Sequence, residues 1–134
     1  MRATLTTSYA ICAAHRLYHP HWSEEKNRQV FGPCADLHGH QYRFEISVAG
    51  TVDPDSGMIL NAFEMENIVR EKVVSQVDHK YLNEAVPFFR EKLPTSEWIA
   101  CWVFQELKKA FPAGCELKQV RVYETPSLFA DVTA

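Results

Sequence analysis

The fold is decided by the stretch His38-Gly39-His40-Gln41-Tyr42-Arg43-Phe44-Glu45-Ile46-Ser47-Val48, in which polar and apolar side chains alternate. A period of two residues predicts a β-strand with one buried face. His38 and His40 lie in phase with the apolar side chains of that face. Because side chains two residues apart on a strand leave the same face, both imidazoles could bind one metal ion.

A second alternating stretch, Ala3–His15, also ends in a histidine. If the two strands pair antiparallel, His15 meets His38 and His40 at one end of the sheet. Three imidazoles with an open fourth position are the ligands of a catalytic zinc site. The alternative is a partly exposed strand end with an unrelated core histidine. Imidazoles in phase with an apolar face are costly without a partner, which favours the metal.

The rest of the chain predicts an α+β class with one domain over residues 1–134. The segment Arg16–Leu37 has the length and composition of a loop that covers a functional site. Capping residues predict two helices, from Asn61 to about Val77 and from Pro94 to Phe111, each with one apolar stripe. Glu116–Glu124 alternates as a closing strand. We expect an antiparallel sheet with both helices packed on one face, so that its other face meets water, a ligand or another subunit.

The composition is that of a globular chain: 134 residues, 46% hydrophobic and 23% charged, with a formal net charge of −3. The lack of a Lys/Arg run argues against nucleic acid or an anionic membrane surface as a partner. No apolar run approaches the roughly 18 residues of a membrane span, and the first residues lack the core of a secretory signal, so we expect a cytoplasmic protein. Four cysteines without a CxxC pair are expected to be free thiols: Cys12, Cys34, Cys101 and Cys115.

Three further features carry candidate chemistry. Cys34, four residues before His38, could be a small buried side chain, a fourth zinc ligand or a thiolate general base. Asp78-His79 is either a charged helix end or an acid/base histidine poised by a carboxylate. Glu124 continues the apolar face of the closing strand. It could form a salt bridge, or accept paired hydrogen bonds from an N–H-rich heterocycle such as a pterin or guanine edge.

With these residues in place, the chain resembles the 6-pyruvoyl-tetrahydropterin synthase and 6-carboxytetrahydropterin synthase family, which has the tunnelling fold. The resemblance covers nearly the whole length, and several ordered motifs carry it. The motifs are Ala13-Ala14-His15-Arg16-Leu17, Cys34-x-x-x-His38-Gly39-His40, Asp53-Pro54-x-x-Gly57-Met58, Asp78-His79-x-x-Leu82-Asn83, Pro94-Thr95-Ser96-Glu97 and Glu124-Thr125.

The resemblance implies a role for each candidate residue. Zn2+ would be held by the three histidines, and a cysteine would accept a proton. An Asp-His pair would tune proton transfer, a glutamate would anchor the pterin, and a Thr-Ser pair would contact the substrate. In this sequence the implied residues are His15, His38 and His40 for the metal, Cys34, Asp78, His79 and Glu124 for catalysis, and Glu124, Thr95 and Ser96 for substrate binding. The family also implies a homohexamer of two stacked trimers, whose sheets assemble into an oligomeric barrel with sites at subunit interfaces.

Three residues separate Cys34 from His38, a spacing that resembles the 6-carboxytetrahydropterin synthases. Those enzymes convert 7,8-dihydroneopterin triphosphate to 6-carboxy-5,6,7,8-tetrahydropterin, with release of acetaldehyde and triphosphate, in queuosine and deazapurine synthesis. One alternative is a 6-pyruvoyl-tetrahydropterin synthase, which eliminates triphosphate in tetrahydrobiopterin synthesis. A second alternative is a noncatalytic zinc-containing pterin-binding protein, and a third is a zinc hydrolase that uses metal-bound hydroxide.

Overall fold

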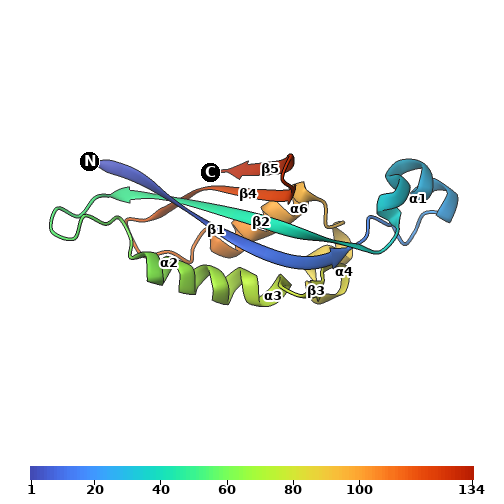
Figure 1. The fold of residues 1–134 in the computed structure, drawn as a ribbon, viewed down its shortest axis with the longest axis horizontal. Coiled ribbons are helices and arrows are strands. Elements are labelled where there is room, and N and C mark those ends of the chain that lie inside the picture. The colour runs from blue at the N-terminus through green and yellow to red at the C-terminus, as the bar shows by residue number, and fades with distance from the viewer.

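The computed structural model describes residues 1–134 and contains one five-stranded sheet with the strand order β3-β1-β2-β4-β5. Two long antiparallel strands form its centre, and all helices except α1 lie on one side of them (Figure 1). The strands are β1 (Arg2–His15), β2 (His38–Thr51), β3 (Lys80–Tyr81), β4 (Glu116–Thr125) and β5 (Leu128–Thr133). The expected α+β class with a mainly antiparallel sheet is confirmed.

Both predicted helices are present. The first begins after Asn61, whose side chain accepts a hydrogen bond from the Phe63 amide, and continues through a π-helical turn to Val77. The second begins after Thr95, which caps it in the same way, and ends at Leu107 rather than Phe111. The helices are α1 (Glu24–Phe31), α2 (Ala62–Val69), α3 (Ser75–Val77), α4 (Leu82–Ala85), α5 (Phe88–Glu91) and α6 (Ser96–Leu107).

The register of β1 with β2 places His15 directly opposite His38. It also pairs Ile11 with Tyr42 and Leu5 with Val48, so the apolar sides of both strands face the same way. Side chains of β1 on the other side, from Thr4 to Cys12, are exposed. The predicted inward and outward faces of the two strands are therefore confirmed.

One core of 24 buried residues fills the space between this sheet face and the helices. Helix α6 packs on β4 and β5, while α2 and α3 cover the side toward β1. Their apolar stripes are fully buried: Met65, Val69, Val73 and Val77 on one, and Ile99, Val103 and Leu107 on the other. Burial of a Val, Leu or Ile side chain stabilises the fold by about 1.5–3 kcal/mol, which makes these stripes the main attachment of the helices.

The closing strand departs from simple alternation at Leu117. The sequence places Leu117 on the face opposite Val120, yet both are buried. Val48 pairs with Leu117 and Ser47 pairs with Gln119, so Lys118 is the extra residue of a β-bulge. The bulge shifts the phase by one residue and turns Leu117 into the core.

The segment Arg16–Leu37 is not the structureless loop that its composition suggested. It contains α1, capped by Ser23, and a 3-10 turn at Gly32–Ala35. The buried Asn27 side chain accepts a hydrogen bond from the His19 amide, at 2.7 Å, and donates to the carbonyls of His19 and Ser23. These bonds close the segment on itself at the end of the sheet where β1 ends and β2 begins (Figure 1).

Four short elements were not predicted. β3 adds two residues beside Ala13 and Ala14, and α4 and α5 follow it. After Glu124 the chain turns and returns as β5, which pairs with β4. The short strand and helices lack a full period of apolar residues, and for this reason periodicity did not indicate them.

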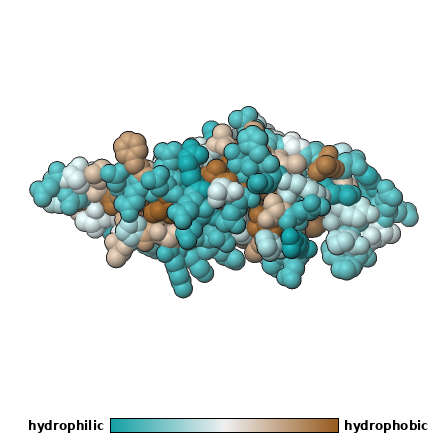
Figure 2. Space-filling model, turned by 90° about the horizontal axis from the view of Figure 1, so that it is seen from below, coloured by the Kyte–Doolittle hydropathy of each residue, from teal (hydrophilic) through white to brown (hydrophobic).

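The helix side of the molecule is largely hydrophilic, with small separated apolar patches (Figure 2). Large apolar side chains that remain exposed include Met58 and Phe63. None of the helices has both the length and the apolar character that crossing a membrane requires.

Asn27 provides a test of how the segment around α1 is held. Replacing Asn27 by Ala leaves the His19 amide without its acceptor, and an unpaired buried polar group costs about 1–3 kcal/mol. We expect faster amide hydrogen exchange in residues 19–31 with little change in the central strands. The exposed Gln29→Ala in the same helix is the control. Equal exchange in the two variants would contradict the role of Asn27.

Candidate metal centre

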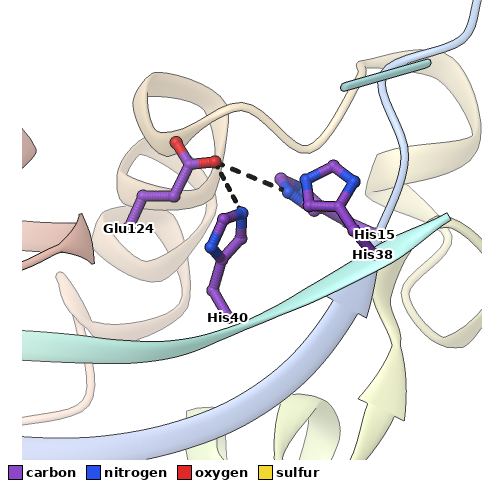
Figure 3. A group of neighbouring side chains, drawn as sticks. All are labelled: His15, His38, His40 and Glu124. Atoms are coloured by element: carbon purple, nitrogen blue, oxygen red, sulfur yellow. Dashed lines mark ion pairs between the residues drawn. The ribbon is translucent and has the colours of Figure 1, made fainter. Parts of the chain in front are cut away.

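Three imidazoles meet at the end of the β1–β2 pair (Figure 3). The ring centres of His15 and His38 are 4.5 Å apart, those of His38 and His40 are 4.9 Å apart, and those of His15 and His40 are 5.1 Å apart. His15 is fully buried, whereas His38 and His40 are partly exposed. The predicted meeting of the three histidines is confirmed.

Backbone carbonyls orient two of the rings. His15 Nδ1 lies 2.8 Å from the Pro94 carbonyl oxygen, and His38 Nδ1 lies 2.7 Å from that of Asp36. A carbonyl only accepts, so both Nδ1 atoms carry the proton and both Nε2 atoms keep a free lone pair. This arrangement is typical of metal-binding histidines, whose second nitrogen is held by a carbonyl or carboxylate.

Glu124 reaches the same point from β4. Its Oε1 atom lies 2.8 Å from His40 Nε2 and 3.6 Å from His15 Nε2, as the dashed lines of Figure 3 mark. Its Oε2 atom accepts a hydrogen bond from the Ser96 hydroxyl at 3.1 Å. As its phase with Val120 and Val122 predicted, Glu124 lies on the inner face of the sheet.

These four residues fit a divalent metal ion. One donor atom from each lies within 4.8 Å of the others. His15 Nε2 is buried without a hydrogen-bond partner and His40 Nε2 is buried against Glu124 Oε1, and burial lowers the pKa of His15 to about 4 and also lowers that of His40. Near neutral pH both rings are therefore uncharged, and the lone pair of His15 Nε2 lies 3.6 Å from the Glu124 carboxylate oxygen. A cation between them would satisfy all these lone pairs, and three imidazoles with a carboxylate suit Zn2+.

Cys34 lies in the 3-10 turn four residues before His38, and its side chain is partly buried. Its thiol is not among the four clustered donor atoms, and the fourth donor is Glu124. The structure thus supports a role other than metal ligand for Cys34. Its action as a base stays a prediction.

Asp78 and His79 lie at the edge of β1, outside the donor group. Asp78 accepts a hydrogen bond from the Cys12 amide, and the His79 amide donates to the Cys12 carbonyl at 2.6 Å. His79 has φ 61°, a left-handed conformation that is uncommon outside glycine, and its side chain is 78% exposed. Together with the outward-facing Gln41, it lines a cavity of about 510 Å³ that includes Cys12. The pair is thus directed away from the chain's own core.

Thr95 and Ser96 both make structural contacts. Thr95 caps α6 by accepting from the Trp98 amide, and Ser96 donates to Glu124. A larger cavity, of about 890 Å³, borders Glu124 and His40 and extends over the open sheet face to Arg43. It is large enough for a bicyclic ligand.

Two features of the site were not foreseen from the sequence. The Tyr42 hydroxyl is buried without a protein partner, and burial raises its pKa. Tyr42 contacts the metal-site rings edge-on, 5.4 Å from His40 and 5.8 Å from His15 between ring centres. The second feature is the pair of carbonyls that orient His15 and His38, which no pattern of side chains encodes.

Fold and site together define an α+β protein in which three histidines and a glutamate that could hold a metal ion meet at one end of a mainly antiparallel sheet. The chain belongs to the 6-pyruvoyl tetrahydropterin synthase family, whose model matches residues 4–134.

Several named proteins are similar over most of their length. The chain is 35% identical to 6-pyruvoyl tetrahydrobiopterin synthase from Homo sapiens, over 92% of this chain and 86% of that protein. It is 34% identical to 6-carboxy-5,6,7,8-tetrahydropterin synthase from Synechocystis, over 84% and 79%. The structure of Caenorhabditis elegans 6-pyruvoyl tetrahydropterin synthase superposes with a TM-score of 0.91 at 31% identity, covering 100% of this chain and 96% of that chain.

Metal addition tests the donor group. If free Zn2+ reaches about 100 times its Kd, binding to the folded state adds roughly 2.7 kcal/mol of stability. Titration of the metal-stripped protein should therefore raise Tm with one ion bound per chain. His38→Ala should abolish the rise, and the exposed His21→Ala should keep it. A rise that persists in His38→Ala would contradict the site.

Acidification should destabilise the metal-stripped protein. The pKa of His15 is about 4 when folded, against a reference of 6.5. As pH falls below 6.5, the His15 imidazole binds a proton in the unfolded chain but stays neutral in the folded chain. The free energy of unfolding therefore falls by roughly 3 kcal/mol toward pH 4. Urea denaturation from pH 7 to pH 4 measures this slope. His15→Gln should flatten it, and an unchanged slope in that variant would contradict the assignment.

Proposed function

We propose that the protein is a zinc-dependent lyase that acts on 7,8-dihydroneopterin triphosphate. The observation that carries this proposal is the convergence of the side chains of His15, His38, His40 and Glu124 at one point, within a chain of this family. A zinc ion held by the three histidines would polarise the oxygens of the substrate side chain.

Cys34 is the proposed base. Its turn leads directly into the strand that carries His38 and His40, so the thiol and two of the three histidines belong to one short segment. As a thiolate, Cys34 would remove a proton from the substrate side chain. General bases contribute rate factors of about 10²–10⁴.

Glu124 is the proposed pterin anchor. In this proposal the three histidines alone hold the metal once substrate is bound, and the Glu124 carboxylate then accepts hydrogen bonds from the N–H groups of the pterin edge instead of facing the metal. The Ser96 hydroxyl holds Oε2 in place, which fixes the direction from which the ring is bound. In this proposal Thr95 and Ser96 contribute to substrate binding through the start of α6.

Assembly into a homohexamer of two trimers is part of the proposal. The edge of β1 from Arg2 to Ile11 and the outer edge of β5 both lack a strand partner. Unpaired strand edges are sites for pairing with another chain. Sheets joined through these edges would form a barrel and cover the open face. The exposed Asp78-His79 pair would then act at a neighbouring subunit's centre.

For the product we propose 6-carboxytetrahydropterin with release of acetaldehyde, because three residues separate Cys34 from His38. The second candidate is the 6-pyruvoyl product, which is favoured by the names of several relatives, including those from Homo sapiens and Dictyostelium discoideum. Both reactions need the same base and metal.

A cytoplasmic location is consistent with four free cysteines.

Product analysis decides between the two. We expect the zinc-loaded protein, incubated anaerobically with 7,8-dihydroneopterin triphosphate, to yield 6-carboxytetrahydropterin and stoichiometric acetaldehyde. Mass spectrometry and an acetaldehyde assay measure both. A 6-pyruvoyl product without acetaldehyde would establish the second candidate. No turnover with bound zinc would favour a noncatalytic pterin-binding role.

Substitution of Cys34 tests the base. Cys34→Ala should reduce kcat by about 10²-fold or more while zinc stays bound, since the thiol is outside the donor group. Cys101→Ala, in α6, is the control. Turnover retained in Cys34→Ala would remove Cys34 as the base, and loss of zinc would make it a ligand.

A further inference from the structure

The turn that carries Cys34 is attached to the residues that follow His15. The Leu17 amide donates to the Cys34 carbonyl at 2.8 Å. The Arg16 guanidinium donates through Nε to the carbonyl of the buried Ala35, also at 2.8 Å. Arg16 and Leu17, the two residues after His15, therefore hold the backbone carbonyls of Cys34 and Ala35.

Arg16 is itself held from a third part of the chain. The Asn83 side chain in α4 accepts a hydrogen bond from the Arg16 amide at 3.0 Å and donates one to the Arg16 carbonyl at 2.9 Å. Both polar groups of the Asn83 amide are used on a single residue. This pairing imitates a strand partner at the point where β1 ends, and it fixes the direction in which the chain leaves the sheet.

The segment that ends in Asn83 also carries the acid/base pair. It is fixed to β1 at Cys12 through Asp78 and His79, and then at Ala13 and Ala14 through β3. Asn83 adds the last attachment, at Arg16. Residues 78–83 thus run along β1 as one fixed strip.

From these contacts we propose that Asn83 and Arg16 are positioning residues that hold the Cys34 turn in a fixed relation to the metal ligands. This inference rests on the proposed role of Cys34 as the base. The chain of contacts runs from Asn83 to the backbone of Arg16, from Arg16 Nε to the Ala35 carbonyl, and from the adjacent Leu17 amide to the Cys34 carbonyl. The hydrogen bonds of both side chains go to backbone atoms of Arg16 and Ala35, so the effect passes through the position of the Cys34 turn.

The inference explains why these residue types are needed. An amide side chain offers a donor and an acceptor on two neighbouring atoms, which allows it to bond both the amide and the carbonyl of a single residue. Arg16 reaches a carbonyl through Nε, an atom that lysine lacks, while its guanidinium stacks over Tyr18 at 4.0 Å.

The test compares Asn83→Ala and Arg16→Lys with the exposed control Asn67→Ala, all loaded with zinc. Displacement of a reacting group by about 1 Å can reduce a rate 10²-fold. We expect kcat to fall roughly 10-fold or more in both variants, with KM and zinc content near those of the parent protein. Asn83→Asp, which keeps the acceptor for the Arg16 amide, should fall between Asn83→Ala and the parent protein.

A second readout does not depend on turnover. Iodoacetamide should alkylate Cys34 about threefold faster or more in Asn83→Ala and Arg16→Lys, because the turn opens more often. Mass spectrometry of the peptide that contains Cys34 measures the rate, and the peptide that contains Cys101 is the reference. Unchanged alkylation and unchanged kcat would overturn the inference. A fall in kcat that merely follows lost zinc or lost folded protein would also overturn it.

The two readouts separate this inference from the proposed function. If the parent protein does not turn over the pterin triphosphate, the proposed function fails, and faster Cys34 alkylation still establishes that the contacts hold the turn. If the parent protein is active and both variants match it in rate and alkylation, only the positioning role fails.

Discussion

The antiparallel pairing of β1 with β2, in the register that sets His15 opposite His38, is the constraint on which the rest of the structure depends. It places the apolar sides of both strands on one face and brings the three imidazoles to its end. A slip of one residue would turn every side chain of one strand to the other face. Burial of Ile11, Tyr42, Phe44 and Ile46 opposes that slip, so the hydrophobic core also sets the geometry of the metal centre.

The metal centre combines features that are unfavourable without a ligand. The buried His15 Nε2 lacks a hydrogen-bond partner, a carboxylate oxygen lies 2.8 Å from His40 Nε2, and the buried Tyr42 hydroxyl is also unpaired. Burial lowers the pKa of His15 and His40, which favours the neutral imidazole that binds metal. The surrounding structure compensates through backbone carbonyls and the Ser96 hydroxyl, which fix the rings and the carboxylate. The site is thus prepared for a cation before one binds.

The two faces of the sheet carry different kinds of residues. One carries the core and the donor atoms under α2, α3 and α6 (Figure 1). The other is polar, bordered by unpaired strand edges, and carries Asp78 and His79 at the edge of β1. The helix side is largely hydrophilic, with small separated apolar patches (Figure 2). Subunits of the proposed barrel would therefore join through the unpaired strand edges and cover the open face of the sheet.

The sequence by itself predicted the two long strands, the two main helices and the histidine cluster. Each depends on a local period or cap, such as the alternation before His15 or the Asn61 cap, and such patterns are visible without a partner strand. It did not predict the bulge at Lys118, because a bulge is defined by the strand opposite. It also missed α1 and β5, whose residues are held by Asn27 and by β4 rather than by an apolar period. Only the tertiary structure decided that Glu124 rather than Cys34 completes the donor group, and that Asn83 holds Arg16. Those contacts join residues far apart in the chain, and their geometry follows from how the strands and turns pack rather than from any spacing in the sequence.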